Sequence, residues 1–231
     1  MKLSHRLGGQ SEGRLLWSRW RRLAAPSLFF LGVIYYEELF LKLYCFHGLS
    51  LAGAVFTLLF SIPIAMLLGA LCGGVEDRLG RRLLVLCTAL ASLWMGAQTV
   101  YYHLFKTFLT IFSLTKMMMV AGAFGNMAVG EILLNWFPIL MMAVPVVLAA
   151  MLGNRLLPDR PMGRRNNLRW LALGLGVQLA GIVLVLFCGG GVLSLRYIYF
   201  QAAVPELEVQ NFGMFTQTEL EIRRVLFGID P

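Results

Sequence analysis

The chain has 231 residues, of which 58% are hydrophobic and 14% are charged, and its formal net charge is +8. A soluble domain carries roughly a quarter of charged residues, so this composition excludes an ordinary soluble protein and favours a membrane protein. The basic residues lie between apolar segments, which indicates contact with anionic lipid headgroups and argues against nucleic acid as a partner.

Five segments are long and apolar enough to cross a bilayer, which requires about 20 mainly apolar residues. They cover residues 26–46, 50–73, 83–104, 132–153 and 170–193. The predicted fold class is therefore all-α, a polytopic membrane protein with five transmembrane helices. We predict three regions: a basic cytoplasmic tail over 1–25, a transmembrane domain over 26–194 and an extracellular connector over 195–231.

The lysines and arginines of the connections predict the orientation of the bundle. Fourteen of them lie in the N-terminal tail, in 74–82 and in 154–169, whereas the alternate connections and the C-terminal segment hold five. Cytoplasmic loops carry the excess of Lys and Arg in membrane proteins. We therefore expect a multi-pass protein of a bacterial plasma membrane, with the N-terminus in the cytoplasm and the C-terminus outside.

The first span contains an intramembrane polar cluster, made of Tyr35, Glu37, Glu38 and Lys42. A charge at this depth costs a few kcal/mol, so these groups should face protein or water rather than lipid. Glu38 and Lys42 are four residues apart and suited to a helical ion pair. Three interpretations remain open: a structural ion pair, a polar groove for a lipid headgroup or a polymer end, and a proton or ion path.

Small and polar residues inside the spans predict where helices approach one another. Small residues allow close packing, and amides form hydrogen bonds between helices. The residues concerned are Gly69, Gly73, Gly174, Gly176, Ala180, Gln98 and Asn135.

The segment 105–131 is the ambiguous one, because it is apolar enough to resemble a sixth span. We interpret it as an amphipathic helix on the outer face between spans 3 and 4, with aromatic residues near headgroup depth. Its lysines either remain solvated or contact an anionic lipid such as phosphatidylglycerol. The candidate headgroup contacts are Tyr101, Tyr102, His103, Lys106 and Lys116.

Beyond residue 194 we expect a short interfacial helix over 195–204, a turn-rich connector over 206–215 and then a last helix. In the connector, Asn211 and Gly213 allow unusual backbone angles. Capping-box patterns begin at Thr216 and Thr218, which predicts that the last helix starts there. Its apolar residues Leu220, Val225 and Leu226 would share one face. Such a short helix needs a docking partner to be stable.

The four cysteines and three histidines are scattered through the chain without the spacing of a metal site. Buried cysteines behave as small hydrophobic residues, which is the interpretation we adopt. The sequence therefore predicts no metal and no cofactor in this chain.

Three stretches together resemble a known family. They are Tyr101–Leu114 (YYHLFKTFLTIFSL), the acidic Glu38 in the first span, and Asn211–Gly228 (NFGMFTQTELEIRRVLFG). They are similar to the membrane half of the lipoteichoic-acid synthases, in which five helices precede an extracellular sulfatase-like domain.

The resemblance implies transfer of glycerol phosphate from phosphatidylglycerol, by a threonine nucleophile with a divalent metal such as manganese. Those groups belong to the catalytic domain of the family, and none of them can be assigned to a residue here. We therefore expect a fragment, a truncated copy or a stand-alone relative, inactive alone, that anchors and feeds lipid to a catalytic domain or partner protein. The alternatives are a small transporter or channel subunit and a non-catalytic envelope assembly factor.

Overall fold

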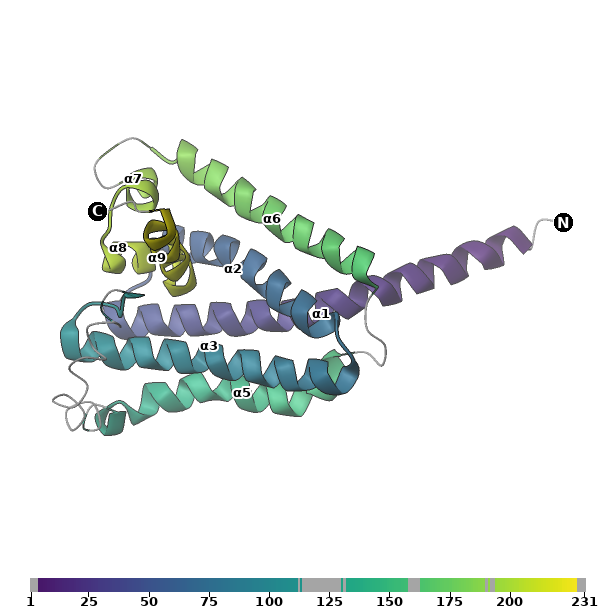
Figure 1. Ribbon diagram of the computed structural model, residues 1–231, viewed down its shortest axis with the longest axis horizontal. Helices are drawn as coiled ribbons and strands as arrows, with labels where there is room; N and C mark the ends of the chain where they lie inside the picture. Colours follow the sequence, from purple (N-terminus) through teal and green to yellow (C-terminus); the bar gives the residue numbers. More distant parts are fainter. Residues whose placement is uncertain are drawn as a thin grey trace.

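A computed structural model describes residues 4–111, 113, 130, 132–157, 163–189, 191 and 194–227, with side chains from Ala24 onward except that of Asp77. All its regular elements are α-helices (Figure 1). The long helices are α1 (Ser4–Phe46), α2 (Leu51–Gly73), α3 (Asp77–Phe105), α5 (Trp136–Leu156) and α6 (Arg164–Phe187). The short ones are α7 (Leu195–Phe200), α8 (Pro205–Phe212) and α9 (Met214–Phe227).

The prediction of five spans is confirmed, because five of these helices are long and apolar enough to cross a membrane. The spans are Ala24–Phe46, Leu51–Gly73, Arg78–Phe105, Trp136–Leu156 and Arg164–Phe187. The third and the fifth begin at arginines, about one to two turns before the predicted apolar segments. Arginine can extend its apolar stem along a span while its charged end reaches the interface.

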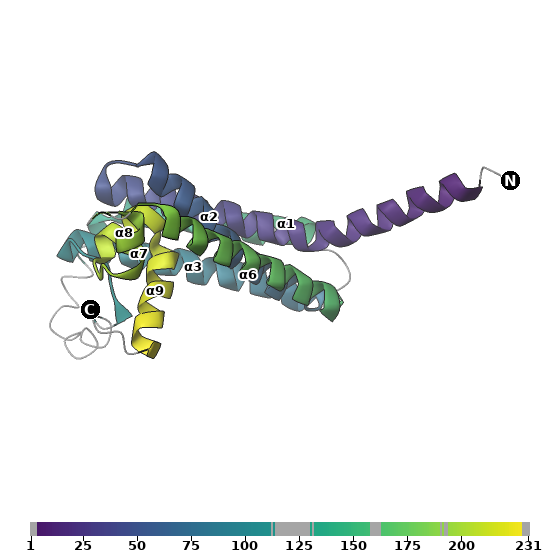
Figure 2. The same cartoon turned by 90° about the horizontal axis from the view of Figure 1, so that it is seen from above.

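The spans form a wedge-shaped bundle rather than a closed one (Figures 1 and 2). Helix α1 packs against α2, α3 and α5, and α3 packs against α5, so that these helices run side by side. Helix α6 packs against α2 and α7 and diverges from α1 toward one end of the bundle (Figure 1). We call the end of the bundle at Phe46, Phe105 and Phe187 the wide end, and the opposite end, where α3 and α6 begin at arginines, the arginine end.

Glycines set the close helix crossings, as predicted for two of them. A Cβ on Gly69 would lie 2.0 Å from Oγ of Ser27, so α1 and α2 can cross there because residue 69 has no side chain. A Cβ on Gly174 would lie 3.4 Å from Cβ of Met66, which places Gly174 against α2. Gly176 has nothing within 4 Å of its Cβ position, so it is not a packing residue.

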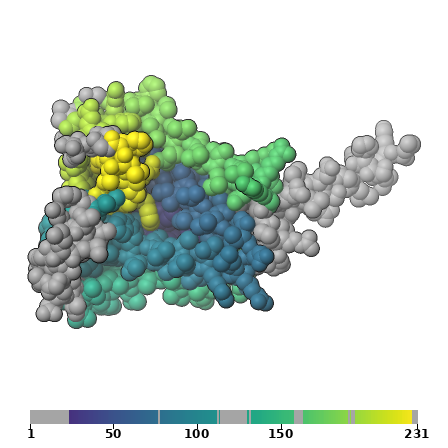
Figure 3. Space-filling model, viewed as in Figure 1, coloured from purple at the N-terminus to yellow at the C-terminus, as the bar shows by residue number. Residues whose placement is uncertain are grey.

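The C-terminal helices α7, α8 and α9 fill the wide end of the wedge (Figure 1). In the space-filling view α9 lies between the surfaces of α2 and the α6–α7 region (Figure 3). An aromatic cluster holds them there: the Tyr199 ring lies 5.5 Å from the Phe60 ring and 5.2 Å from the Phe212 ring, centroid to centroid. The helix that needed a docking partner therefore has one, which is the transmembrane domain itself.

The structure corrects three predictions in this region. The segment expected to be a turn-rich connector is mostly helix α8, which starts at Pro205 because proline suits the first helical position. Helix α9 starts at Met214, so Thr216 and Thr218 lie inside it and cap nothing. Leu220 is buried but Val225 and Leu226 are exposed, so these three do not share a buried face. The expected freedom at Gly213 is confirmed by its φ of +95°.

Most of the segment expected to form an outer-face helix, including Lys116, lies outside the described residues. Its described beginning folds back against α3. The Gln98 side chain donates to the carbonyl oxygen of Leu109 over 3.0 Å and accepts from the Leu109 amide over 2.8 Å. The prediction that Gln98 hydrogen-bonds between helices is therefore wrong, because its partner is the backbone of a loop.

Candidate functional site

The three charged residues of the first span are fully buried and contact three different neighbours. Glu37, Glu38 and Lys42 are each at most 1% exposed. In hydrocarbon, such groups persist where protein partners replace water. The polar cluster of α1 therefore acts as a junction between helices, and each of its contacts is described in turn below.

Glu38 caps the N-terminus of α9. Its Oε2 accepts a hydrogen bond from the Met214 amide over 2.8 Å, and its Oε1 accepts one from the Phe215 amide over 3.0 Å. The first amides of a helix have no partner within the helix, and a negative charge there also interacts favourably with the helix dipole. A carboxylate from another helix thus does the work that a local N-cap side chain does elsewhere.

Gly213 is the residue that lets this contact form. Its φ of +95° is a conformation that side chains other than glycine rarely adopt. A Cβ at this position would also lie 2.8 Å from both carboxylate oxygens of Glu38. Backbone geometry and space therefore both require glycine where α8 turns into α9.

Lys42 contacts α2 rather than Glu38. Its Nζ donates to the carbonyl oxygen of Gly53 over 3.3 Å and also to Oγ1 of Thr57. The ion pair recorded among the described residues joins Arg224 and Glu208, so the predicted Glu38–Lys42 ion pair is wrong. Each side chain is hydrogen-bonded to a separate neighbouring element, although the two opposite charges still attract each other without direct contact.

Glu37 contacts α3, where Oγ of Ser92 donates to its Oε1 over 2.5 Å. Its second oxygen, Oε2, has no hydrogen-bond partner among the described residues. Tyr35, which we grouped with the charged residues, is half-buried and takes no part in the contacts described for them. The neighbouring Tyr36 donates instead to the carbonyl oxygen of Met141 on α5, over 3.2 Å.

The predicted headgroup contacts gather at the wide end in an aromatic rim. The Tyr102 ring stacks on Phe108 with centroids 4.9 Å apart, and Nζ of Lys106 lies 5.9 Å from the centre of the Tyr102 ring. Tyr101 pairs with Phe105 at 4.6 Å, and His103 with Tyr44 at 4.9 Å. Lys106 is exposed. The rim thus combines amphipathic rings with one exposed cation, as suits an interface with headgroups.

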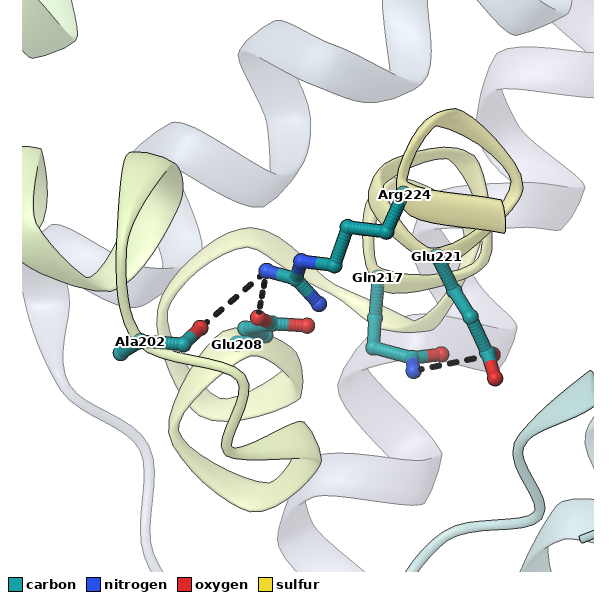
Figure 4. Close-up of polar contacts among 5 residues, drawn as sticks. All are labelled: Ala202, Glu208, Gln217, Glu221 and Arg224. Carbon is teal, nitrogen blue, oxygen red and sulfur yellow. Dashed lines mark hydrogen bonds and ion pairs between the residues drawn. The ribbon is translucent and has the colours of Figure 1, made fainter. Parts of the chain in front are cut away.

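A second polar group, which the sequence analysis missed, joins α8, α9 and the loop that follows α7 (Figure 4). The guanidinium of Arg224 forms an ion pair with Glu208 and donates to the Ala202 carbonyl oxygen over 3.1 Å. Glu208 is fully buried, and burial raises its pKa to about 7, although Arg224 opposes the shift. We call Arg224, Glu208 and the Ala202 carbonyl the C-terminal clamp.

Arg223 makes a separate contact on the same helix. Its guanidinium carbon lies 5.5 Å from the centre of the Tyr199 ring and 5.9 Å from that of Phe200. Such distances are those of cation–π contacts. Both arginines of α9 therefore contact other elements of the same domain.

No group of three His, Cys, Asp or Glu side chains within the described part of the chain is close enough to hold a metal ion. The described polar groups instead bind one another across helix boundaries. Their chemistry is therefore that of positioning, and it assigns no nucleophile or acid–base pair.

Comparison with known proteins gives one match. The family model for the lipoteichoic acid synthase N-terminal domain matches residues 18–195, which is more than half of the chain. No curated protein and no solved structure matches. The match ends at the first residue of α7, so it includes the polar cluster of α1 and the aromatic rim but not the clamp.

Proposed function

Because the chain belongs to the family with the lipoteichoic acid synthase N-terminal domain, we propose that it is the membrane module of a phosphoglycerol transferase. In this proposal the module anchors an extracellular sulfatase-like catalytic domain and presents a lipid substrate, such as phosphatidylglycerol, at the outer leaflet. The N-terminus lies in the cytoplasm and the wide end faces outward. The fourteen basic residues at the arginine end and in the N-terminal tail support this orientation.

The observation that carries the proposal is the contact between Glu38 and the start of α9. It ties the C-terminal helices to the middle of a spanning helix, so a segment attached after Phe227 would start from a fixed point. A flexible linker would leave such a segment free to sample many positions relative to the membrane. A catalytic domain held at a fixed position reacts faster with a substrate that lies at a defined depth in the membrane.

The aromatic rim supports the lipid-presenting part of the proposal. Lys106 is exposed and directly follows α3, whose C-terminal end lies at the same end of the bundle as the C-terminal helices (Figure 1). A phosphate headgroup requires a cation at headgroup depth, and tyrosine rings suit the same layer. The polar cluster is a weaker candidate for substrate contact, because Glu38 and Lys42 are already engaged by protein groups.

A fusion experiment tests the proposal. A sulfatase-like domain of the family is joined after Phe227, or to an unrelated single spanning helix, and both proteins are placed in vesicles containing phosphatidylglycerol. We expect at least about tenfold faster glycerol-phosphate transfer with this module, corresponding to about 1.4 kcal/mol of positioning. Equal rates would contradict the proposal.

Matched variants separate the rim from the rest of the module. Lys106→Gln should raise KM for phosphatidylglycerol, whereas Arg78→Gln, a surface arginine at the opposite end, should leave it unchanged. If both substitutions act equally, the rim does not contact the headgroup.

A further inference from the structure

Two contacts, each made of two hydrogen bonds, mark how deep α9 lies in the bundle. Its first amides bind Glu38, which lies fourteen residues after Ala24, where the first span begins. Halfway along α9, Glu219 accepts hydrogen bonds from Gln178 over 3.0 and 3.1 Å, and Gln178 lies fourteen residues after Arg164, where the fifth span begins. At 1.5 Å per residue, both marks lie about 21 Å from the arginine end.

This depth falls inside the membrane. The hydrocarbon core of a bilayer is about 30 Å thick, so a level about 21 Å from the arginine end is still below the opposite boundary. Tilt of the spans lowers the figure further.

Helix α9 crosses the direction of the spans instead of following it. The spans run along the long axis of the molecule in both views, whereas α9 is seen nearly end-on in Figure 1 and lies across that axis in Figure 2. A helix that starts below the boundary and runs across the spans stays within one leaflet along its length.

The outward surface of α9 is the kind of surface that lipid would cover. Its exposed residues are Glu219, which is bound to Gln178, and four apolar residues. These four are Ile222, Val225, Leu226 and Phe227, with exposed fractions of 44%, 62%, 73% and 74%. The two arginines of the same turns point inward, to the aromatic rings and to the C-terminal clamp.

From this geometry we infer that α9 is an intramembrane helix that lies in the leaflet at the wide end, with its last two turns packed against lipid acyl chains. Segment 195–227 is then part of the membrane domain and not a connector in water. An amphipathic helix in the interface has its apolar face in the acyl layer and its polar face in water. Here protein contacts engage the polar residues, including the exposed Glu219, which is bound to Gln178, and the exposed apolar residues are left for the bilayer.

Spin labelling tests the inference on the full chain in phosphatidylcholine vesicles. A nitroxide is attached at Leu226→Cys or Val225→Cys in a parent whose four native cysteines are replaced by alanine. We expect each label to be more accessible to oxygen than to a water-soluble nickel complex, as at Leu175→Cys on the exposed face of α6. A label at Gly163→Cys, at the start of α6, should show the opposite preference.

Three results would overturn the inference. Greater accessibility of the 225 and 226 labels to the nickel complex would place α9 in water. Spectral broadening between labels on two chains would mean that a second copy covers this face, and loss of access to both reagents would mean another protein contact.

A second measurement does not need the cysteine-free parent. Phe227 is replaced by a photoreactive benzoylphenylalanine, a conservative change at an exposed aromatic position, and irradiated in the same vesicles. The expected product is a chain whose intact mass has increased by one phospholipid. Recovery of the unmodified chain, as expected for a side chain in water, or a crosslinked pair of chains would contradict the inference.

Discussion

Helices α1 and α6 both cross the membrane, but α1 does so with charged residues bound to other helices and α6 with apolar residues exposed to lipid. Helix α1 buries Glu37, Glu38 and Lys42 and connects through them to α3, α9 and α2. The buried residues of α6 are two glycines and Val185, and its leucines are exposed along most of its length. An apolar helix needs no protein partner in lipid, whereas a charged one does. The charged helix is therefore the organising element.

The difference also explains where the C-terminal helices sit. Glu38 needs donors, and the start of α9 supplies two amides that need an acceptor. Each group would be costly to bury alone, so each stabilises the other. Helix α6 contributes a hydrogen bond from Gln178 to Glu219 of α9. This contact lies on the other side of the wedge, and it does not fix the start of α9 as Glu38 does.

The largest expected effect comes from breaking the Glu38 contact at its glycine. Gly213→Val adds a branched side chain where φ is +95° and where a Cβ would lie 2.8 Å from the carboxylate. We expect a loss of about 4 kcal/mol in the free energy of unfolding, from backbone strain and an uncompensated buried charge. Thermal unfolding in detergent and hydrogen exchange of α9 measure it.

Gly176→Val on α6 is the matched control, because nothing lies within 4 Å of its Cβ position. It should change the free energy of unfolding by less than about 1 kcal/mol. Equal losses for the two glycines would show that α1 and α6 do not differ as argued.

A second prediction compares leucines on the two helices. Leu41→Ala on α1 removes a side chain that is fully buried, and Leu175→Ala on α6 removes one that is 68% exposed. The first should cost about 2 kcal/mol, because it leaves a cavity between helices. The second should cost less than about 0.5 kcal/mol, because acyl chains replace the lost contacts. Urea or thermal unfolding of both variants in the same detergent gives the comparison.

The same contrast explains what the sequence could predict. The spans were predictable because crossing a membrane depends on the summed hydropathy of one continuous segment. The burial of Glu38 was predictable for the same local reason. Its partner was not, since Met214 is 176 residues away in the chain and nothing local indicates the pairing.

The C-terminal errors arose where a tertiary contact replaced a local one. Thr216 and Thr218 fit the capping box better than any residue near Met214, yet the cap came from another helix. The expected ion pair between Glu38 and Lys42 was wrong for a similar reason. Helical spacing places the two charges near each other, but it does not show that groups on other elements lie closer to each of them. By contrast, the need for glycine at Gly213 is a backbone property, and the local sequence indicated it correctly.

The smallest expected effect concerns the C-terminal clamp, which holds together the short helices that lie between α1 and α6 (Figure 1). Burial raises the pKa of Glu208 to about 7, and Arg224, Glu206 and Glu221 are the charged groups that act on it. Since this carboxyl binds a proton more tightly in the folded protein, its contribution to stability is full below about pH 4.5 and is lost as pH rises through about 7. The free energy of unfolding should thus be higher at pH 5 than at pH 6, by about 1 kcal/mol.

Glu208→Gln isolates this contribution, because glutamine keeps the shape and a hydrogen-bond acceptor for Arg224 but cannot titrate. The difference between the parent and Glu208→Gln should therefore change between pH 5 and pH 8, whereas Glu76→Gln, an exposed acid at the start of α3, should follow the parent. If stability instead rose with pH in the parent and not in Glu208→Gln, the carboxylate would gain more from Arg224 than it loses by burial. The wedge would then depend on a second intact charge contact like that of Glu38, and α1 would no longer be the sole organising helix.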